Sequence, residues 1–259
     1  WLAGEGVKEL IIVAQDPTAY GEDWGKPGSI CELLDKLNKV PGLEWIRIMY
    51  AYPERITDEF IAAMKRNEKV VPYLDLPIQH CNDTILKNMN RRSTRAELLE
   101  VIGKLRREIP GITLRTTLIA GFPGETEEQF EDLCNFVKEV QFDRLGCFAY
   151  SAEEDTKAAE MPDQIDDEIK QHRADIIMEH QQSVMAEYCE SLIGKEIEVL
   201  VEGYDRIAEC FYGRTYADAP EIDGCVFFTA NGTKPQPGSF VKVKITDYTD
   251  CDPIGELAE

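Results

Sequence analysis

The segment Thr117–Thr126 (TLIAGFPGET) carries the residues whose types and spacing best suit ligand binding. Its pattern indicates a buried strand that ends in a glycine-rich turn and opens directly into a helix. Gly121 and Gly124 have no Cβ and so admit a ligand close to the backbone, and the helix N-terminus offers free N–H groups. A tight turn without a ligand explains the same pattern. The position at the carboxyl end of a strand favours binding, because α/β barrels hold substrates there.

A second candidate is the segment Leu76–Arg92 (LPIQHCNDTILKNMNRR). Gln79 stands at the end of a predicted strand, where its amide can hydrogen-bond hydroxyl groups. Arg91 or Arg92, one helix later, can form a two-pronged hydrogen bond with a carboxylate, although arginines at a helix end are also commonly solvated. His80 has no carboxylate or metal partner nearby in the sequence, so we expect it to be structural.

The eight cysteines are spread so widely that no two lie within five residues of each other. Because a spacing such as C-x-x-C is missing, we expect isolated, reduced thiols and no metal site in this chain. Carboxylates are abundant, as the composition requires, but form no convincing catalytic pair or Ser-His-Asp arrangement. The sequence therefore assigns no catalytic residue.

Short β-branched runs alternate with helical patterns from about residue 9 to 150, which predicts an α/β fold with repeated βα units around a parallel sheet. The predicted strands are Glu9–Ala14, Trp45–Tyr50, Tyr73–Ile78, Thr113–Ile119 and Arg144–Ala149. Capping boxes predict helix starts at Ser29 with Glu32, Thr94 with Glu97, and Thr126 with Gln129. Five strands make only a partial (β/α) barrel.

A long amphipathic helix is predicted from Gln164 to about Ser191, closing the barrel and leading out of it. After Gly194 apolar and polar residues alternate with period two, between turns rich in glycine and proline. This pattern predicts a small all-β, OB-like barrel. We therefore divide the chain into residues 1–192 and 193–259.

The formal net charge of −21 restricts the partners, because phosphate backbones repel carboxylates. Tight general binding to nucleic acid is disfavoured, and a basic protein partner fits the charge better. The sequence has no apolar run long enough for a membrane span, and its first residues lack the features of a signal peptide. We expect a cytosolic protein without a membrane partner.

Five stretches of the sequence resemble one known family. They are Val13–Gly21, Leu76–Arg92, Thr117–Thr126, Phe142–Thr156 and Gly213–Gly224. The first four are similar to the methylthiotransferase branch of the radical SAM superfamily, and the last resembles the TRAM domain of that branch. The resemblance covers nearly the whole chain and implies a partial barrel of the radical SAM type followed by a TRAM domain.

The resemblance also implies S-adenosylmethionine as a cofactor, bound by Gln79, Arg91, Gly121, Pro123, Gly124, Gln15 and Asp16. Gln79 would face the ribose, Arg91 the carboxylate, and Gln15 with Asp16 the methionyl amine. The turn Gly121–Gly124 would lie near the adenine or ribose. Gln15 and Asp16 depart from the superfamily's usual Gly-Glu pair, and Thr117 stands where a carboxylate is common.

The superfamily's C-x-x-x-C-x-x-C loop, which holds a 4Fe-4S cluster, has no counterpart in this sequence. The resemblance places it upstream of Trp1, together with a domain that carries a second cluster. The chain starts without methionine, and Leu2–Val7 is typical of a helix end closed by Gly4 or Gly6. We expect the natural protein to extend upstream, and this chain alone to bind no cluster and to be inactive.

The family implies that the parent enzyme adds a methylthio group to the β-carbon of an aspartate in ribosomal protein uS12. Two alternatives stay open: a tRNA adenosine methylthiotransferase, and a non-catalytic ribosome-binding module. Residues 195–259 contain 6 basic and 13 acidic residues, a net charge of −7, against −14 for the remainder. This balance favours a basic ribosomal protein over tRNA.

Overall fold

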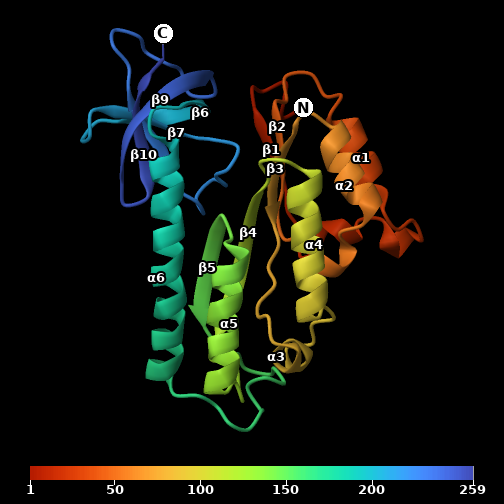
Figure 1. Cartoon of the computed structure of the whole chain (residues 1–259). Coiled ribbons are helices and arrows are strands. Elements are labelled where there is room, and N and C mark those ends of the chain that lie inside the picture. The colour runs from red at the N-terminus through yellow and green to blue at the C-terminus, as the bar shows by residue number, and fades with distance from the viewer. Residues whose placement is uncertain (259) are drawn as a thin grey trace.

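The computed structural model describes residues 1–258 as an open α/β sheet followed by a small β-barrel (Figure 1). The strands of the sheet are all parallel and lie in chain order: β1 (Glu9–Ile12), β2 (Trp45–Ile48), β3 (Val70–Asp75), β4 (Thr113–Ala120) and β5 (Arg144–Ala149). The longer helices are α1 (Ser29–Leu37), α2 (Asp58–Arg66), α4 (Arg95–Glu108), α5 (Glu127–Val140) and α6 (Asp167–Leu192). Shorter ones are α3 (Asp83–Asn88), η1 (Pro17–Ala19), η2 (Glu22–Trp24) and η3 (Pro53–Arg55).

The predicted strands are all present, although four have shifted ends; β4 ends one residue later than predicted. β5 has its predicted bounds, whereas β1 and β2 each end two residues early. β3 begins and ends three residues earlier than predicted, because Val70 already pairs with Ile46 of β2 and Pro77 has no N–H to continue the ladder. Pairing resumes at one isolated bridge between Gln79 and Leu118.

Two of the three predicted capping boxes are confirmed. Thr94 and Thr126 each accept a hydrogen bond from the backbone N–H three residues on, and the side chains of Glu97 and Gln129 bond back to them. The prediction for Ser29 is wrong. Its helix has Gly28 as the N-cap, and the Ser29 hydroxyl donates to the Lys26 carbonyl instead.

The second part of the chain is a closed five-stranded barrel, as the alternating pattern predicts. Its strands β6 (Glu196–Asp205), β7 (Cys210–Arg214), β8 (Val226–Thr229), β9 (Phe240–Thr249) and β10 (Asp252–Leu257) lie in the order β10-β8-β7-β6-β9. Side chains on alternate positions fill it, among them Val199, Val201, Phe228, Val243 and Ile245. Closure leaves no unpaired strand edge.

Helix α6 runs along β5 and joins the sheet to the barrel (Figure 1). Its Met178 sulfur accepts the Cys147 N–H at 3.3 Å, so this helix covers the outer edge of β5. The main core lies between the sheet and helices α1 to α6, with Leu74, Leu114 and Phe136 fully buried. None of the helices in the described residues has the length and apolarity that a membrane crossing requires.

The small barrel closes the amino end of the sheet's inner face, the face turned away from the core. The loop Arg214–Asp223 reaches onto this face and forms buried ion pairs with the strands. Arg214 pairs with Glu9 at 2.6 Å, and Asp218 pairs with Arg144 at 2.6 Å. We call this loop the plug. It lies at the opposite end of the sheet from α3 and so does not cover the carboxyl ends of the strands (Figure 1).

Candidate functional site

A cavity of about 680 Å³ lies at the carboxyl ends of β3 and β4. Gln79 lines it and is held by two backbone hydrogen bonds to β4, from its own N–H to Thr117 and from the Ile119 N–H to its carbonyl, each 2.9 Å. The backbone of Gln79 has a φ of 70°, a left-handed conformation that is energetically costly for any residue with a Cβ atom. The fold thus fixes the backbone of Gln79 at the cavity despite local strain.

Arg91 lines this cavity and also a neighbouring one of about 580 Å³. Its Nη2 donates to the Pro77 carbonyl at 2.8 Å, and its guanidinium lies over the Tyr52 ring, 4.7 Å from the centroid. Within residues 1–258 no carboxylate lies at ion-pair distance from Arg91. Its charge and remaining N–H groups are therefore available to an acidic group of a ligand.

Asp16 lines the second cavity beside Arg91, whereas Gln15 is exposed and lines neither one. The Asp16 carboxylate is already engaged: it accepts the Thr18 N–H at 3.1 Å and pairs with Arg55 at 2.6 Å. The structure thus brings Gln79, Arg91 and Asp16 to two adjoining cavities. A methionyl amine near Asp16 would share that carboxylate with Arg55.

The glycine-rich turn lies next to the cavity, but its three predicted binding residues, Gly121, Pro123 and Gly124, do not line it. Gly121 donates its N–H to both Glu125 carboxylate oxygens at 3.1 Å, and a Cβ there would meet Lys170 Cγ of α6 at 2.3 Å. Pro123 is buried, and the Gly124 N–H donates to the Asp163 carbonyl at 3.0 Å. The missing Cβ of Gly121 makes room for α6, and the Phe122 side chain lines the cavity.

Glu125 is the centre of a buried polar cluster that the sequence did not reveal. Arg173 of α6 donates to its carboxylate at 2.8 Å and to its carbonyl at 3.1 Å. His80, fully buried, places Nε2 3.3 Å from the same carboxylate, a contact too poorly aligned for a full hydrogen bond. The His80 Nδ1 accepts the Asn82 N–H at 2.9 Å, so this nitrogen carries no proton.

His80 therefore has a carboxylate neighbour in the fold, 45 positions away in the sequence, and its fully buried position agrees with the expected structural role. The cluster connects the residue after Gln79, the Gly121 turn and α6, so it fixes the backbone on two sides of the cavity. A signal was present in the sequence, because Glu125 directly follows Gly124 in the motif. Nothing in the spacing pointed to Arg173, which lies 48 residues away.

The residues of the larger cavity fit S-adenosylmethionine in size and chemistry. Its volume is within the roughly 300–1,000 Å³ typical of small-molecule sites. Ile119 and Phe122 offer an apolar wall for an adenine, whereas Gln79 and Arg91 offer polar groups for a ribose and a carboxylate. The Tyr150 hydroxyl, buried against Phe122, has no hydrogen-bond partner in the described chain and can accept or donate one.

The thiols do not fit an iron–sulfur cluster. Residues 1–258 contain no group of three or more metal-binding side chains. Burial raises the pKa of the cysteines above its ordinary value, to about 12 for Cys147 and about 11 for Cys189 and Cys225. A raised pKa disfavours the thiolate that a metal requires.

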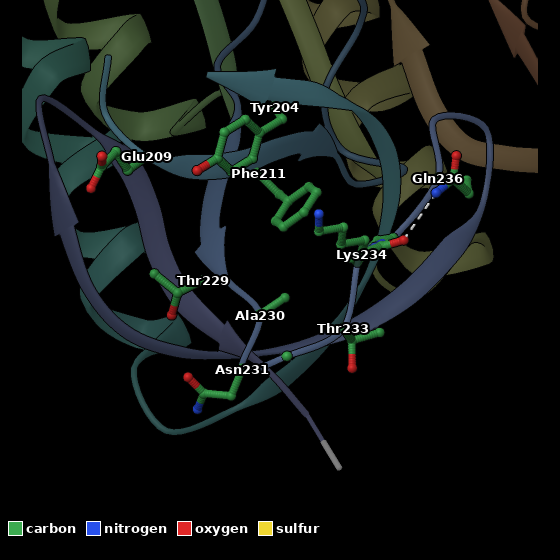
Figure 2. Close-up of a pocket in the computed structure, with 11 residues that line it drawn as sticks. Tyr204, Glu209, Phe211, Thr229, Ala230, Asn231, Thr233, Lys234 and Gln236 are labelled. Carbon is green, nitrogen blue, oxygen red and sulfur yellow. Dashed lines mark hydrogen bonds between the residues drawn. The ribbon is translucent and has the colours of Figure 1, made fainter. Parts of the chain in front are cut away.

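The small barrel has a cavity of its own, of about 580 Å³ (Figure 2). Tyr204 and Phe211 form its aromatic wall, with ring centroids 4.9 Å apart. Lys234 extends its amine toward Phe211, and Glu209 lies on the other side of Tyr204. The charged residues lining this cavity are one lysine and one glutamate, beside amide and hydroxyl groups. The lining therefore favours neither a positively nor a negatively charged ligand.

Two protein families match the chain: the TRAM domain at residues 193–258 and the Radical SAM superfamily at residues 1–137. The ribosomal protein uS12 methylthiotransferase RimO of Caldanaerobacter subterraneus subsp. tengcongensis is 49% identical over 98% of this chain and 58% of its own length. RimO of Geobacter sulfurreducens is 49% identical over 99% of this chain and 57% of its own.

The chain thus spans less than three fifths of these two relatives. Among solved structures, Elp3 of Methanocaldococcus infernus gives a TM-score of 0.47 at 16% identity, over 68% of this chain and 44% of its own. The superfamily match covers more than half of the 259 residues and includes Gln79 and the Gly121 turn. The chain therefore belongs to the radical SAM superfamily and ends in a TRAM domain.

Proposed function

We propose that this chain is the C-terminal part of a methylthiotransferase that modifies the β-carbon of an aspartate in ribosomal protein uS12. One observation carries the proposal: relatives with that name are 49% identical to it over almost its whole length. The division at residues 192 and 193 is supported by the TRAM match, which begins at 193. A ribosomal substrate implies that the enzyme acts in the cytoplasm.

In this proposal the chain binds and orients S-adenosylmethionine. Arg91 binds the carboxylate with its unpaired charge, and Gln79 hydrogen-bonds the ribose from its fixed position on the edge of β4. Phe122 and Ile119 exclude water from the adenine side. Bound S-adenosylmethionine supplies the radical chemistry that a C–H bond without acidity requires. The thiols of residues 1–258 do not fit a cluster, so no step of the proposal depends on them.

The cofactor assignment is tested by titration calorimetry on the full-length enzyme. We expect Arg91→Ala to weaken S-adenosylmethionine binding by about tenfold to a hundredfold, the value of a charge-assisted hydrogen bond. Gln79→Ala should weaken it by about tenfold. Arg107→Ala, an exposed arginine of α4, is the matched control and should leave affinity unchanged. Unchanged affinity in both test variants would remove the assignment.

The acidic charge of the TRAM segment supports a protein substrate over tRNA. Its net charge of −7 repels phosphates and attracts a basic ribosomal protein. Mass spectrometry separates the two after anaerobic incubation of the reconstituted enzyme with reductant, sulfide and S-adenosylmethionine. A methylthio increment on the uS12 aspartate supports the proposal, and an increment on tRNA alone overturns it. Modification of neither, without release of 5′-deoxyadenosine, favours a ribosome-binding module.

A further inference from the structure

A groove of about 520 Å³ runs between β5, α6 and the small barrel, separate from both cofactor cavities. Gly146 and Phe148 of β5 form one side of it, and Met178 and Met185 of α6 form another. The barrel contributes two loops, one with Glu221, Ile222 and Asp223 and one with Asp250. We call it the β5–α6 groove. Residues 221–223 are the last residues of the plug, so the groove lies against the plug on the inner face of the sheet.

The apolar part of this groove is unusually exposed. Phe148 keeps 59% of its surface accessible and Ile222 keeps 47%, although they belong to different domains. Met185 and Met178, with flexible thioether side chains, adapt readily to an incoming apolar group. Exposed apolar surface of this kind, with polar groups at its rim, is typical of a protein interaction site.

The charge of the β5–α6 groove is negative, despite two arginines in its lining. Arg144 is neutralised by Asp218 at 2.6 Å, and Arg115 by Asp75 at 2.8 Å. Glu221 and Asp250 have no ion-pair partner within the described chain, so their charges face any ligand that enters. Such a rim attracts lysine and arginine side chains and repels phosphates.

The groove also contains an unused hydrogen-bond acceptor. Gln181 of α6 lines the groove and is only 3% exposed. Its Nε2 donates to the Phe142 carbonyl at 3.1 Å, while its Oε1 has no partner among residues 1–258. A buried acceptor without a partner is costly, and a donor such as a peptide N–H would relieve that cost.

The groove adjoins the candidate cofactor cavity. Phe148 pairs in register with Ile119 on the neighbouring strand, and Ile119 lines the cavity beside Gln79. A chain lying along Phe148 is therefore about 5 Å, one strand spacing, from Ile119 at the cavity.

We propose that the β5–α6 groove binds an extended, basic segment of the protein substrate. An apolar side chain of that segment lies between Phe148 and Ile222, and flanking lysines or arginines pair with Glu221 and Asp250. This inference rests on the proposed function, for which it names the docking site. RNA and a second copy of this chain are the competing occupants, and the negative rim disfavours both.

Fluorescence anisotropy of labelled uS12 with the full-length enzyme, without reductant, tests the groove. We expect Phe148→Ala with Ile222→Ala, and separately Glu221→Lys with Asp250→Lys, each to weaken binding by about tenfold. In the charge-reversed variant, the affinity for uS12 should also lose most of its dependence on salt concentration. Its matched control is Glu100→Lys with Glu131→Lys, the same change of charge on exposed positions of α4 and α5. The control should bind like the wild type.

The outcomes distinguish failure of the groove from failure of the proposed function. If the wild type methylthiolates uS12 while both groove variants bind it normally, the groove is wrong and the function stands. If the wild type leaves uS12 unmodified but binds a synthetic lysine–leucine peptide that both variants lose, the groove stands and the function falls. Two other results would overturn the docking proposal. One is that an RNA oligonucleotide binds the wild type and binds Phe148→Ala with Ile222→Ala more weakly. The other is that the groove variants change only the self-association of the enzyme, measured by sedimentation.

Discussion

The two ends of the sheet's inner face differ in how their polar groups are used. At the amino ends of the strands the plug satisfies buried charges, with Arg144 paired to Asp218 and Arg214 paired to Glu9. At the carboxyl ends Arg91 has no carboxylate partner among the described residues. One face thus carries a closed end that holds two domains together and an open end that suits ligands, as in other α/β barrels.

The closed end should lose the most stability when one charge is removed. Asp218 accepts hydrogen bonds from Arg144 at 2.6 Å and from the Thr215 N–H at 3.0 Å, all buried. Because Asp218→Ala leaves the Arg144 charge buried and unpaired, we expect it to lower the free energy of unfolding by about 3–5 kcal/mol. Urea unfolding followed by circular dichroism measures this loss.

The matched control for that experiment is an exposed ion pair of the open α/β part. Lys65 and Glu108 lie 3.1 Å apart with side chains 47% and 40% exposed, so Lys65→Ala should change stability little. Replacing both partners, Arg144→Met with Asp218→Leu, should recover much of the loss, because no unpaired charge stays buried. An equal loss in Asp218→Ala and Lys65→Ala would show that the plug contributes no more than a surface pair.

The sequence predicted most of the local features, with the Ser29 capping box as an exception, and missed the contacts between distant segments. The capping boxes at Thr94 and Thr126 depend on residues three apart, and both are present. Glu125 and His80 are 45 positions apart, and only the folded sheet brings them to 3.3 Å. The segment Gly213–Gly224 pointed to the TRAM domain, yet its role as a plug depends on residues of β5 and β1 that lie 74 and 205 positions earlier.

The glycine-rich turn shows why spacing alone does not separate a binding turn from a structural one. A glycine that admits a ligand and a glycine that admits a neighbouring helix have the same sequence pattern. In the structure α6 occupies the space beside Gly121, while the space beside Gly124 is empty. The predicted strand ends were wrong for a similar reason. Hydrogen bonds to neighbouring strands decide where a strand stops, and the local sequence pattern does not show them.

That difference predicts unequal effects of two matched substitutions at the open end. Both glycines have a φ near +75°, so alanine at either position carries a left-handed penalty of about 1–2 kcal/mol. Gly121→Ala also forces its Cβ against Lys170, so we expect a total loss of about 2–4 kcal/mol. Gly124→Ala should show the backbone penalty alone. Thermal and urea unfolding compare the two, and equal losses would contradict the close approach of α6.

The smallest effect at neutral pH is expected at Tyr188, which lies beside the plug. Its ring lies under the Arg144 guanidinium, 5.0 Å from the centroid, and burial raises the pKa of the phenol from 10.0 to about 12. As the pH rises, the unfolded chain therefore loses the phenol proton at a lower pH than the folded protein does. The stabilising contribution is complete below pH 10 and disappears as the pH rises toward about 12.

Tyr188→Phe removes the titrating group and keeps the ring. We expect stability within about 1 kcal/mol of the wild type at pH 7, and a shallower fall of stability above pH 10, by up to about 1.4 kcal/mol per pH unit. Urea unfolding at a series of alkaline pH values measures the difference between the two proteins. Tyr204→Phe, on an exposed tyrosine of the small barrel, is the control. If both variants follow the wild type, the phenol of Tyr188 does not couple the closed end to pH.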